Sequence, residues 1–316
     1  MEMRRCGMTL VLALIMTALL LPAPGAAADT IVDLPIDFTP GMPLQATFEQ
    51  GVKVYDDPSI HVEYYSERST ELSCTYYVAD IKIATAAQLR TESAAGGEKG
   101  FTSRQRVPVH IMARRMNAAV ALDGDYYGEH PGALVLRQGV IFRGVQETYH
   151  DLLLIDEDGD FHVILAGNRD TEEGYGNTFP STPVTEEQLT YTEDGKKIIN
   201  GFDFGPCIIL NGEAVEANPR SIVHPHKTQS WNRAQRICLC QMGPLEYRIV
   251  AVAHFGLSVQ DMTKLVLSLC GVQTAYMFDG GESAQIAFLG RKINNVNGSQ
   301  PRDVCDCIYF ASAYQP

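Results

Sequence analysis

The sequence lacks an excess of positive charge, a long apolar run beyond its first 28 residues, and any cysteine pair spaced as in zinc motifs. The 25 lysines and arginines are outnumbered by 38 aspartates and glutamates, and the formal net charge is −13. Such a surface disfavours nonspecific nucleic-acid binding, because it repels phosphates. It does not exclude an anionic substrate, which needs only local positive charge.

The first 28 residues form a targeting segment. Arg4 and Arg5 precede an apolar run over residues 8–21, and alanines at 26–28 offer small residues for cleavage. This pattern predicts a signal peptide over residues 1–28 and a secreted or extracytoplasmic protein. The run is short for a membrane span, so an uncleaved N-terminal anchor is the weaker alternative. No transmembrane helix is expected in the mature chain.

Cysteine usage indicates packing or disulfides rather than metal binding. One of the eight cysteines, Cys6, lies in the targeting segment, which leaves an odd number and therefore at least one free thiol. Two pairs, Cys238 with Cys240 and Cys305 with Cys307, lie in strand-like runs where alternation places both members on one face. Zinc motifs usually separate their cysteines by two to four residues, so metal is the weaker interpretation of these pairs.

The rest of the chain shows no internal repeat and no abrupt change in amino-acid composition. We expect an extended lead-in over residues 29–70 and a single domain over residues 71–316. Most predicted strands are joined by hairpins and few helices are expected, which indicates an α+β fold with a mixed, largely antiparallel β-sheet core. A capped helix is predicted to begin at Ser258, and the polar residues 168–200 are predicted to form a long loop.

Two stretches share one design, in which a buried strand runs into a loop of acids and glycines. Residues 274–278 lead into D-G-G-E-S at 279–283, and residues 118–122 lead into D-G-D at 123–125. Glycine allows a tight turn and lets a ligand approach the main chain, so a carboxylate there can form a rigid catalytic corner. The alternative is a turn whose Asp and Ser side chains only bond the backbone.

Six blocks in order resemble the phosphodiester glycosidase family. They are Y-Y-V-A-D-I-K at residues 76–82, N-A-A-V-A-L-D-G-D-Y-Y at 117–127, F-G-P at 204–206 with N-G-E at 211–213, R-I-C-L-C-Q-M-G-P-L at 236–245, Y-M-F-D-G-G-E-S at 276–283, and I-N at 293–294 with R-D-V-C-D-C-I-Y-F at 302–310. The chain departs from the family pattern at Asp123 (usually Asn), Ile237 (Thr), Cys240 (Gly) and Glu282 (Gly).

The resemblance implies a single phosphodiester-glycosidase-like domain that hydrolyses the glycosidic bond of a sugar-1-phosphodiester, such as that of N-acetylglucosamine, in an envelope or extracellular glycan. An acid or a cation must help the phosphate leave, and a carboxylate must activate water or stabilise the oxocarbenium-like centre. Asp279 is the first predicted carboxylate and Asp125 the second. Arg236 offers a planar fork to phosphate, and His254 an acid or base. A surface ion pair for Arg236 and a structural role for His254 are the alternatives.

The predicted substrate-binding residues lie on these loops and in the closing blocks. They are Asp123, Gly124, Gly280, Gly281, Glu282, Ser283, Asn294 and Arg302. The expected partner is a carbohydrate-phosphate molecule or polymer. A rival hypothesis, motivated by the departures at Ile237 and Cys240, is a non-catalytic glycan- or cell-envelope-binding module on the same fold.

Four acids, Asp123, Asp125, Asp279 and Glu282, are expected to meet at one strand-end rim. Carboxylates this close repel one another. Either one or two stay protonated, or a hard cation such as Ca²⁺ or Mg²⁺ lies among them. The alternative is that the acids atypical of the family, Asp123 and Glu282, face water or pair with Arg236 and Arg302. His224 and His226, in a polar loop, are weaker metal candidates.

Overall fold

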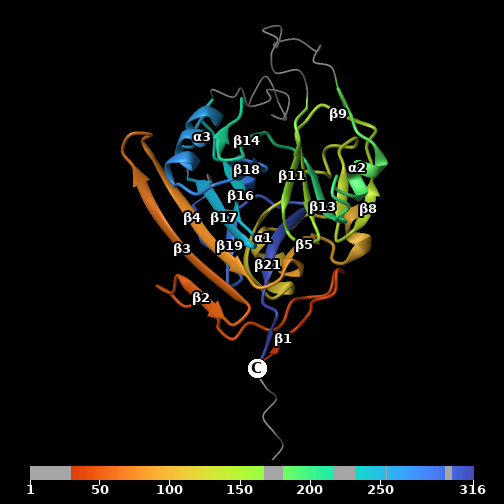
Figure 1. Cartoon of the computed structure of the whole chain (residues 1–316). Coiled ribbons are helices and arrows are strands. Elements are labelled where there is room, and N and C mark those ends of the chain that lie inside the picture. The colour runs from red at the N-terminus through yellow and green to blue at the C-terminus, as the bar shows by residue number, and fades with distance from the viewer. Residues whose placement is uncertain (1–29, 167–180, 217–231, 254, 296–300) are drawn as a thin grey trace, which may run out of the picture.

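The computed structural model describes residues 30–166, 181–216, 232–253, 255–295 and 301–316 (Figure 1). The predicted signal peptide and three histidines, His224, His226 and His254, therefore lie outside the described residues. No helix in the described ranges is long and apolar enough to cross a membrane.

The largest sheet has eight strands in the order β15-β14-β18-β16-β17-β4-β3-β2. Its strands are β2 (Val54–Asp57), β3 (Ile60–Ser69), β4 (Cys74–Ile83), β14 (Cys207–Leu210), β15 (Glu213–Ala214), β16 (Ile237–Gly243), β17 (Glu246–Val252) and β18 (Thr274–Met277). The segment predicted as an extended lead-in thus contributes β2 and β3 to this sheet, and β2 is an edge strand.

A second sheet has five strands in the order β20-β19-β6-β21-β5. They are β5 (Leu89–Ser93), β6 (Ala118–Asp123), β19 (Ile286–Phe288), β20 (Arg291–Lys292) and β21 (Asp306–Ala311). Strand β21 lies between β5 and β6, so a late segment of the chain completes the middle of this sheet.

A third sheet, also of five strands, has the order β11-β10-β13-β7-β8. It consists of β7 (Val135–Arg137), β8 (Val140–Arg143), β10 (Leu152–Asp156), β11 (Phe161–Ile164) and β13 (Ile198–Asp203). Two small pairs join β1 (Thr30–Ile31) to β22 (Tyr314–Gln315) and β9 (Glu147–Thr148) to β12 (Thr182–Pro183). Every pairing between the named strands is antiparallel.

Three α-helices occur in the described residues: α1 (Val109–Arg115), α2 (Glu186–Thr190) and α3 (Val259–Ser268). Helix α3 begins as predicted, because the Ser258 hydroxyl accepts a hydrogen bond of 3.0 Å from the Asp261 N–H. This bond satisfies one of the free N–H groups of the first turn. The expected loop at 168–200 is only partly a loop, because β12, α2 and the first residues of β13 lie within it.

The largest apolar core lies between the sheets, and the second largest lies under α3. Large side chains of the first, such as Tyr276, Phe278 and Phe310, are almost fully buried. Burial of each such ring contributes roughly 1.5–3 kcal/mol, so this core fixes the strand ends that carry the loops of interest. The fold is therefore the largely antiparallel α+β architecture that the sequence predicts, with α3 against β14, β16 and β18 in Figure 1.

Candidate active site

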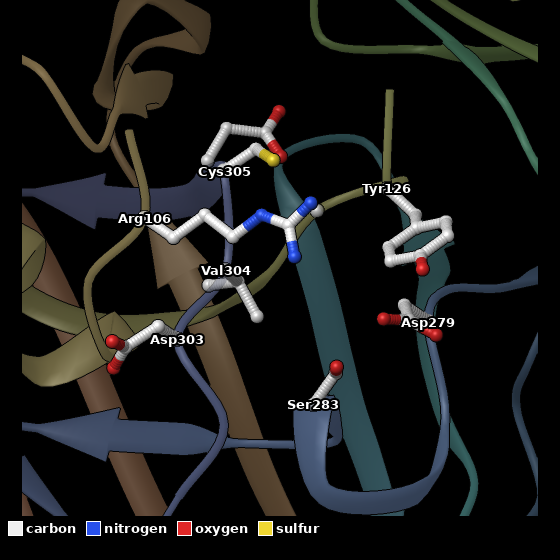
Figure 2. Close-up of a pocket in the computed structure, with 9 residues that line it drawn as sticks. Arg106, Tyr126, Asp279, Ser283, Asp303, Val304 and Cys305 are labelled. Carbon is white, nitrogen blue, oxygen red and sulfur yellow. The ribbon is translucent and has the colours of Figure 1, made fainter. Parts of the chain in front are cut away.

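The loops after β6 and β18 meet the start of β21 at one rim of the molecule. Cys307 of β21 pairs with Asp123 of β6, and the Asp279 N–H lies 3.4 Å from the Gly124 carbonyl oxygen. The two acidic loops predicted to meet are therefore in direct contact. A small cavity lies between them, shown in Figure 2 and lined by Arg106, Gly124, Tyr126, Asp279, Ser283, Asp303, Val304, Cys305 and Asp306.

Arg137, which the sequence analysis did not single out, is buried and binds two acids of this rim. The Arg137 guanidinium pairs with Asp125 at 2.8 Å and with Asp306 at 3.0 Å, and all three side chains are at most 1% exposed. Arg137 also donates to the carbonyl oxygens of Leu136 and Gly201. One buried cation is thus shared by two carboxylates, which is stable only when the remaining charge is neutralised or well bonded.

Asp306 holds its proton near neutral pH. Burial raises the pKa of Asp306 to about 7, with Asp125 adding to the rise and Arg137 opposing it. Asp125, in contrast, has both oxygens bonded, one to Arg137 and the other to the Asp203 N–H at 3.2 Å. The two acids therefore have different environments, the condition under which one carboxyl donates a proton and a neighbour stays ionised.

Asp123 is a second acid kept in the neutral form. Burial and then the neighbouring charge of Asp279 raise the pKa of Asp123 well above its usual range. One of its oxygens accepts a 3.3 Å hydrogen bond from the Gln285 N–H, and the other has no hydrogen-bond partner. Of the alternatives predicted for the four acids, protonation of one of them therefore fits Asp123, and Asp306 is a further acid whose pKa is raised.

Two backbone features fix the loop after β6. A Cβ on Gly124 would lie 2.1 Å from an Asp306 carboxylate oxygen, so this position accepts only glycine without displacing Asp306. Tyr126 holds a φ of 63°, a left-handed conformation that is unusual for a bulky residue and costs roughly 1–3 kcal/mol. Strain of this kind is retained where the surrounding structure needs it, and here it places the Tyr126 ring against the cavity beside Asp279 (Figure 2).

Of the predicted site residues, Gly124, Asp279 and Ser283 line this cavity, whereas Asn294 and Arg236 are held by contacts elsewhere. Asn294 bonds the Ala284 carbonyl oxygen at 2.6 Å and the Ile286 N–H at 2.8 Å, so its side chain braces the chain between the D-G-G loop and β19. Arg236 is buried and donates to the carbonyl oxygens of Leu257 and Asn232. Burial lowers the pKa of Arg236 to about 10. In this structure neither side chain lines the small cavity.

Glu282 and Arg302 pair with each other at the surface, at 3.7 Å, and Arg302 also bonds the Ser283 hydroxyl at 3.4 Å. Glu282 thus follows the predicted alternative of an arginine partner. Asp123 does not, because it faces the interior. No group of three or more His, Cys, Asp or Glu side chains in the described ranges is arranged to hold a metal ion. The structure gives no support to Ca²⁺ or Mg²⁺ at this rim, because arginines hold Asp125 and Glu282.

The sequence reasoning missed Asp306, Arg137 and Arg106. A signal for Asp306 was present, since it is the second Asp of the R-D-V-C-D-C-I-Y-F block that supported the family resemblance. Arg137 sits in β7 without a local signal, because its partners Asp125 and Asp306 come from distant segments. Arg106 precedes α1, and its guanidinium reaches into the cavity in Figure 2. It also pairs with Glu129, which lies outside the cavity lining.

The antiparallel β-fold places the carboxyl groups of Asp279 and Asp306 at one cavity, and a pair of carboxyl groups is the basic equipment of glycosidases. The family model for phosphodiester glycosidases matches residues 116–311, and the chain belongs to this family. None of the curated proteins matches the sequence.

Solved structures support the fold assignment. The catalytic domain of zebrafish N-acetylglucosamine-1-phosphodiester α-N-acetylglucosaminidase, auto-inhibited by its pro-peptide, superposes with a TM-score of 0.60 at 15% identity, covering 82% of this chain and 86% of that one. A hypothetical protein from Synechocystis superposes with a TM-score of 0.50 at 14% identity, covering 82% of this chain and 64% of that one. At these identities the likeness concerns the fold.

Proposed function

We propose that this chain is an exported hydrolase that cleaves the glycosidic bond of a sugar-1-phosphodiester, of the N-acetylglucosamine type, in an envelope or extracellular glycan. The observation that carries this proposal is the pair of acids at the cavity. Asp279 faces the cavity from the D-G-G loop, and Asp306, beneath Gly124, holds a proton near neutral pH. Family membership supports the same chemistry.

The proposed reaction assigns one task to each acid. Asp279 takes a proton from water, and the water oxygen forms a bond to the anomeric carbon. The bond between that carbon and the phosphate oxygen breaks, and its electron pair goes to the phosphate. Asp306 gives its proton to that oxygen, so the products are a free sugar and a phosphate monoester. The proton taken by Asp279 later returns to Asp306 through water.

Arg106, whose side chain is 35% exposed, is the proposed phosphate-binding cation beside the small cavity, in place of Arg236. Its guanidinium lies beside Cys305 and points into the cavity (Figure 2). A planar guanidinium offers two parallel N–H groups to phosphate oxygens. Asp125 acts here through Arg137, which it holds against Asp306, and is therefore a positioning residue rather than a second nucleophile. His254 stays a predicted acid or base outside the described residues.

The rival hypothesis of a non-catalytic glycan-binding module loses part of its motivation. Ile237 is fully buried in the core between the sheets, and Cys240 is fully buried beneath α3. Neither side chain lines the cavity, so these departures from the family pattern alter packing rather than the proposed catalytic groups.

The test is hydrolysis of methyl N-acetyl-α-D-glucosaminyl phosphate by the purified mature chain. Phosphorus and proton NMR would follow methyl phosphate and free N-acetylglucosamine. We expect both products to appear in equal amounts with the wild-type chain and to be nearly absent with Asp279→Asn. Binding of the probe without any release of products would instead favour the glycan-binding module.

A further inference from the structure

A second and much larger cavity lies beside the proposed catalytic rim. Its volume is about 540 Å³, within the range of roughly 300–1,000 Å³ that is usual for small-ligand sites. The catalytic cavity has only about 10 Å³, about enough for one water molecule. The small cavity therefore has room for the attacking water, and a sugar ring needs the larger one.

The two cavities share a wall. Tyr126 lines the small cavity, and its ring packs edge-on against His130, a lining residue of the large cavity, at 5.6 Å between ring centroids. Beneath them, the Asp203 N–H donates to Asp125, and Asp125 binds Arg137. A ligand in the large cavity is thus separated from the acids by one aromatic layer.

The wall of the large cavity presents stacked rings and polar groups together. The His130 ring lies parallel to the His150 ring, with centroids 5.6 Å apart and 22° between planes, and continues the stack toward Phe204. His150 Nδ1 bonds Asp203 at 2.9 Å, and the other Asp203 oxygen accepts the Leu134 N–H. Asp203 thus fixes the His150 ring, whose side chain is 25% exposed.

We propose that this second cavity is a subsite for one pyranose ring of the substrate, with the His130–His150 stack as its aromatic platform and the His150–Asp203 pair as its hydrogen-bonding group. Ring faces stack on the apolar face of a sugar, and a fixed imidazole beside a carboxylate bonds adjacent hydroxyls. The subsite deepens the proposed function, because it places a sugar of the phosphodiester one ring away from Asp279 and Asp306.

The first experiment measures binding of methyl N-acetyl-α-D-glucosaminyl phosphate by calorimetry in an Asp279→Asn background, which prevents turnover. We expect His150→Ala and His130→Ala each to raise the Kd about tenfold, through loss of stacking and hydrogen bonds. His162→Ala is the matched control, since His162 bonds Asp156 at the same 2.9 Å but lines neither cavity. An unchanged Kd in both the His150 and His130 variants, for this probe and for the alcohol-side probe glucose 6-(methyl phosphate), overturns the subsite.

A second measurement needs no histidine variant and so does not depend on their folding. Diethyl pyrocarbonate modifies accessible histidines, and peptide mass spectrometry follows each one in the Asp279→Asn protein. We expect saturating probe to slow modification of His150 severalfold, while the exposed His61 and His162 react at unchanged rates. Equal rates for His150 without probe, with this probe and with glucose 6-(methyl phosphate) contradict the proposal.

Two probes decide which sugar occupies the cavity. Methyl N-acetyl-α-D-glucosaminyl phosphate carries a ring only on the anomeric side of the phosphate, and glucose 6-(methyl phosphate) carries one only on the alcohol side. Dependence of the first Kd on His150 assigns the subsite to the glycosyl ring, and dependence of the second assigns it to the alcohol. If the Kd of neither probe depends on His150, the subsite proposal is overturned.

The two proposals fail separately. Binding that depends on His150 without any hydrolysis by the wild-type chain retains the subsite and removes the proposed catalytic function. Hydrolysis by the wild-type chain, together with a Kd that neither histidine variant changes, retains the proposed catalytic function and removes the subsite.

Discussion

Single residues at the rim differ in charge state because their surroundings differ. Asp125 and Asp306 share one arginine, so one of the two carboxylates lacks a full counter-charge. Burial raises the pKa of Asp306 to about 7, and the two Asp125 oxygens are bonded by Arg137 and by the Asp203 N–H. Asp279, in the D-G-G loop of the same rim, is half-buried and therefore less buried than Asp123, Asp125 and Asp306.

The Asp279→Asn variant should lose turnover of a sugar-1-phosphodiester by roughly two or more decades, the usual scale for a general base. The substitution is nearly isosteric, so the melting temperature should stay within a few degrees of wild type. Steady-state kinetics and thermal melting measure the two effects. Glu246→Gln, which removes a surface acid paired with Lys82, is the control and should retain full turnover. Full activity in Asp279→Asn excludes the assigned role.

The pH profile tests Asp306. Its folded-state pKa of about 7 means that the proton-bearing form falls as the pH rises through neutrality. We therefore expect kcat of the wild-type chain to decline on the basic side of about pH 7, and Asp306→Asn to be much slower and to lack this limb. A rate that stays level from pH 5 to 9 in the wild type, or the same limb in Asp306→Asn, disproves proton donation by Asp306.

The raised pKa of Asp123 predicts how the stability of the fold depends on pH. Its pKa is raised in the folded state, so above its usual value the unfolded chain has released the proton that the folded chain retains. Unfolding then releases a proton, and the contribution of Asp123 to stability is lost as the pH rises from mildly acidic to mildly basic. Asp123→Asn removes this dependence and restores the residue usual in the family.

We therefore expect the melting temperature of Asp123→Asn, minus that of the wild type, to grow steadily between pH 5 and pH 8. Thermal melting monitored by circular dichroism at matched ionic strength gives this difference. A constant difference across the range means that Asp123 titrates as an ordinary carboxyl.

At the scale of elements, the site depends on the register of β6 and β21. Pairing of Cys307 with Asp123 places Asp306 next to Gly124, and the missing Cβ of Gly124 makes room for the Asp306 carboxylate. The D-G-G loop then closes over this pair through the contact between the Asp279 N–H and Gly124. Three segments far apart in sequence are thus positioned by two backbone contacts and one glycine.

Gly124→Ala should displace the Asp306 carboxylate, because the added methyl group would lie 2.1 Å from its oxygen. We expect a loss of about 1–3 kcal/mol in the free energy of unfolding, together with loss of turnover. Chemical denaturation and kinetics measure these. Gly243→Ala serves as control, since a Cβ there meets nothing within 4 Å. Equal behaviour of the two alanine variants would show that Gly124 is not needed for space.

Local patterns predicted the elements well and their long-range partners poorly. The strands that became β6 and β18, and the cap of α3, follow from alternation and from the Ser258–Asp261 spacing. The capping box that begins α2 at Thr185 was equally present in the sequence but was overlooked within the predicted loop. Local patterns do not encode which strand lies beside which, so the position of β21 between β5 and β6 could not be predicted, nor could the closeness of Asp306 to Gly124 and Arg137.

At the scale of the whole molecule, the cysteines add packing rather than covalent links. All seven cysteines of the described residues are free thiols, and six of them are buried. Cys238 and Cys240 lie on one face, as predicted, with their sulfur atoms 3.6 Å apart. The disulfide alternative for these pairs is therefore not adopted in this structure.

A thiol titration tests this arrangement. In the native mature chain we expect one fast-reacting thiol, Cys270, because it is the exposed cysteine of the described residues. Cys270→Ser should abolish the fast phase, and denaturant should release six further thiols from the wild type. A reducing agent should leave the melting temperature unchanged within about 1 °C, since no cross-link constrains the unfolded chain. Fewer than seven reactive thiols in denaturant would reveal a disulfide.

The central place of β21 has a consequence for biosynthesis. A ribosome makes residues 89–93 and 118–123, which become β5 and β6, well before the strand that separates them at 306–311. Until that strand emerges, β5 lacks a pairing partner, β6 can pair only with β19, and Arg137 lacks the Asp306 half of its ion pair. Closing a loop of this length is entropically costly and slow. The catalytic rim therefore forms only late in synthesis, and a polypeptide interrupted before residue 306 carries no assembled site.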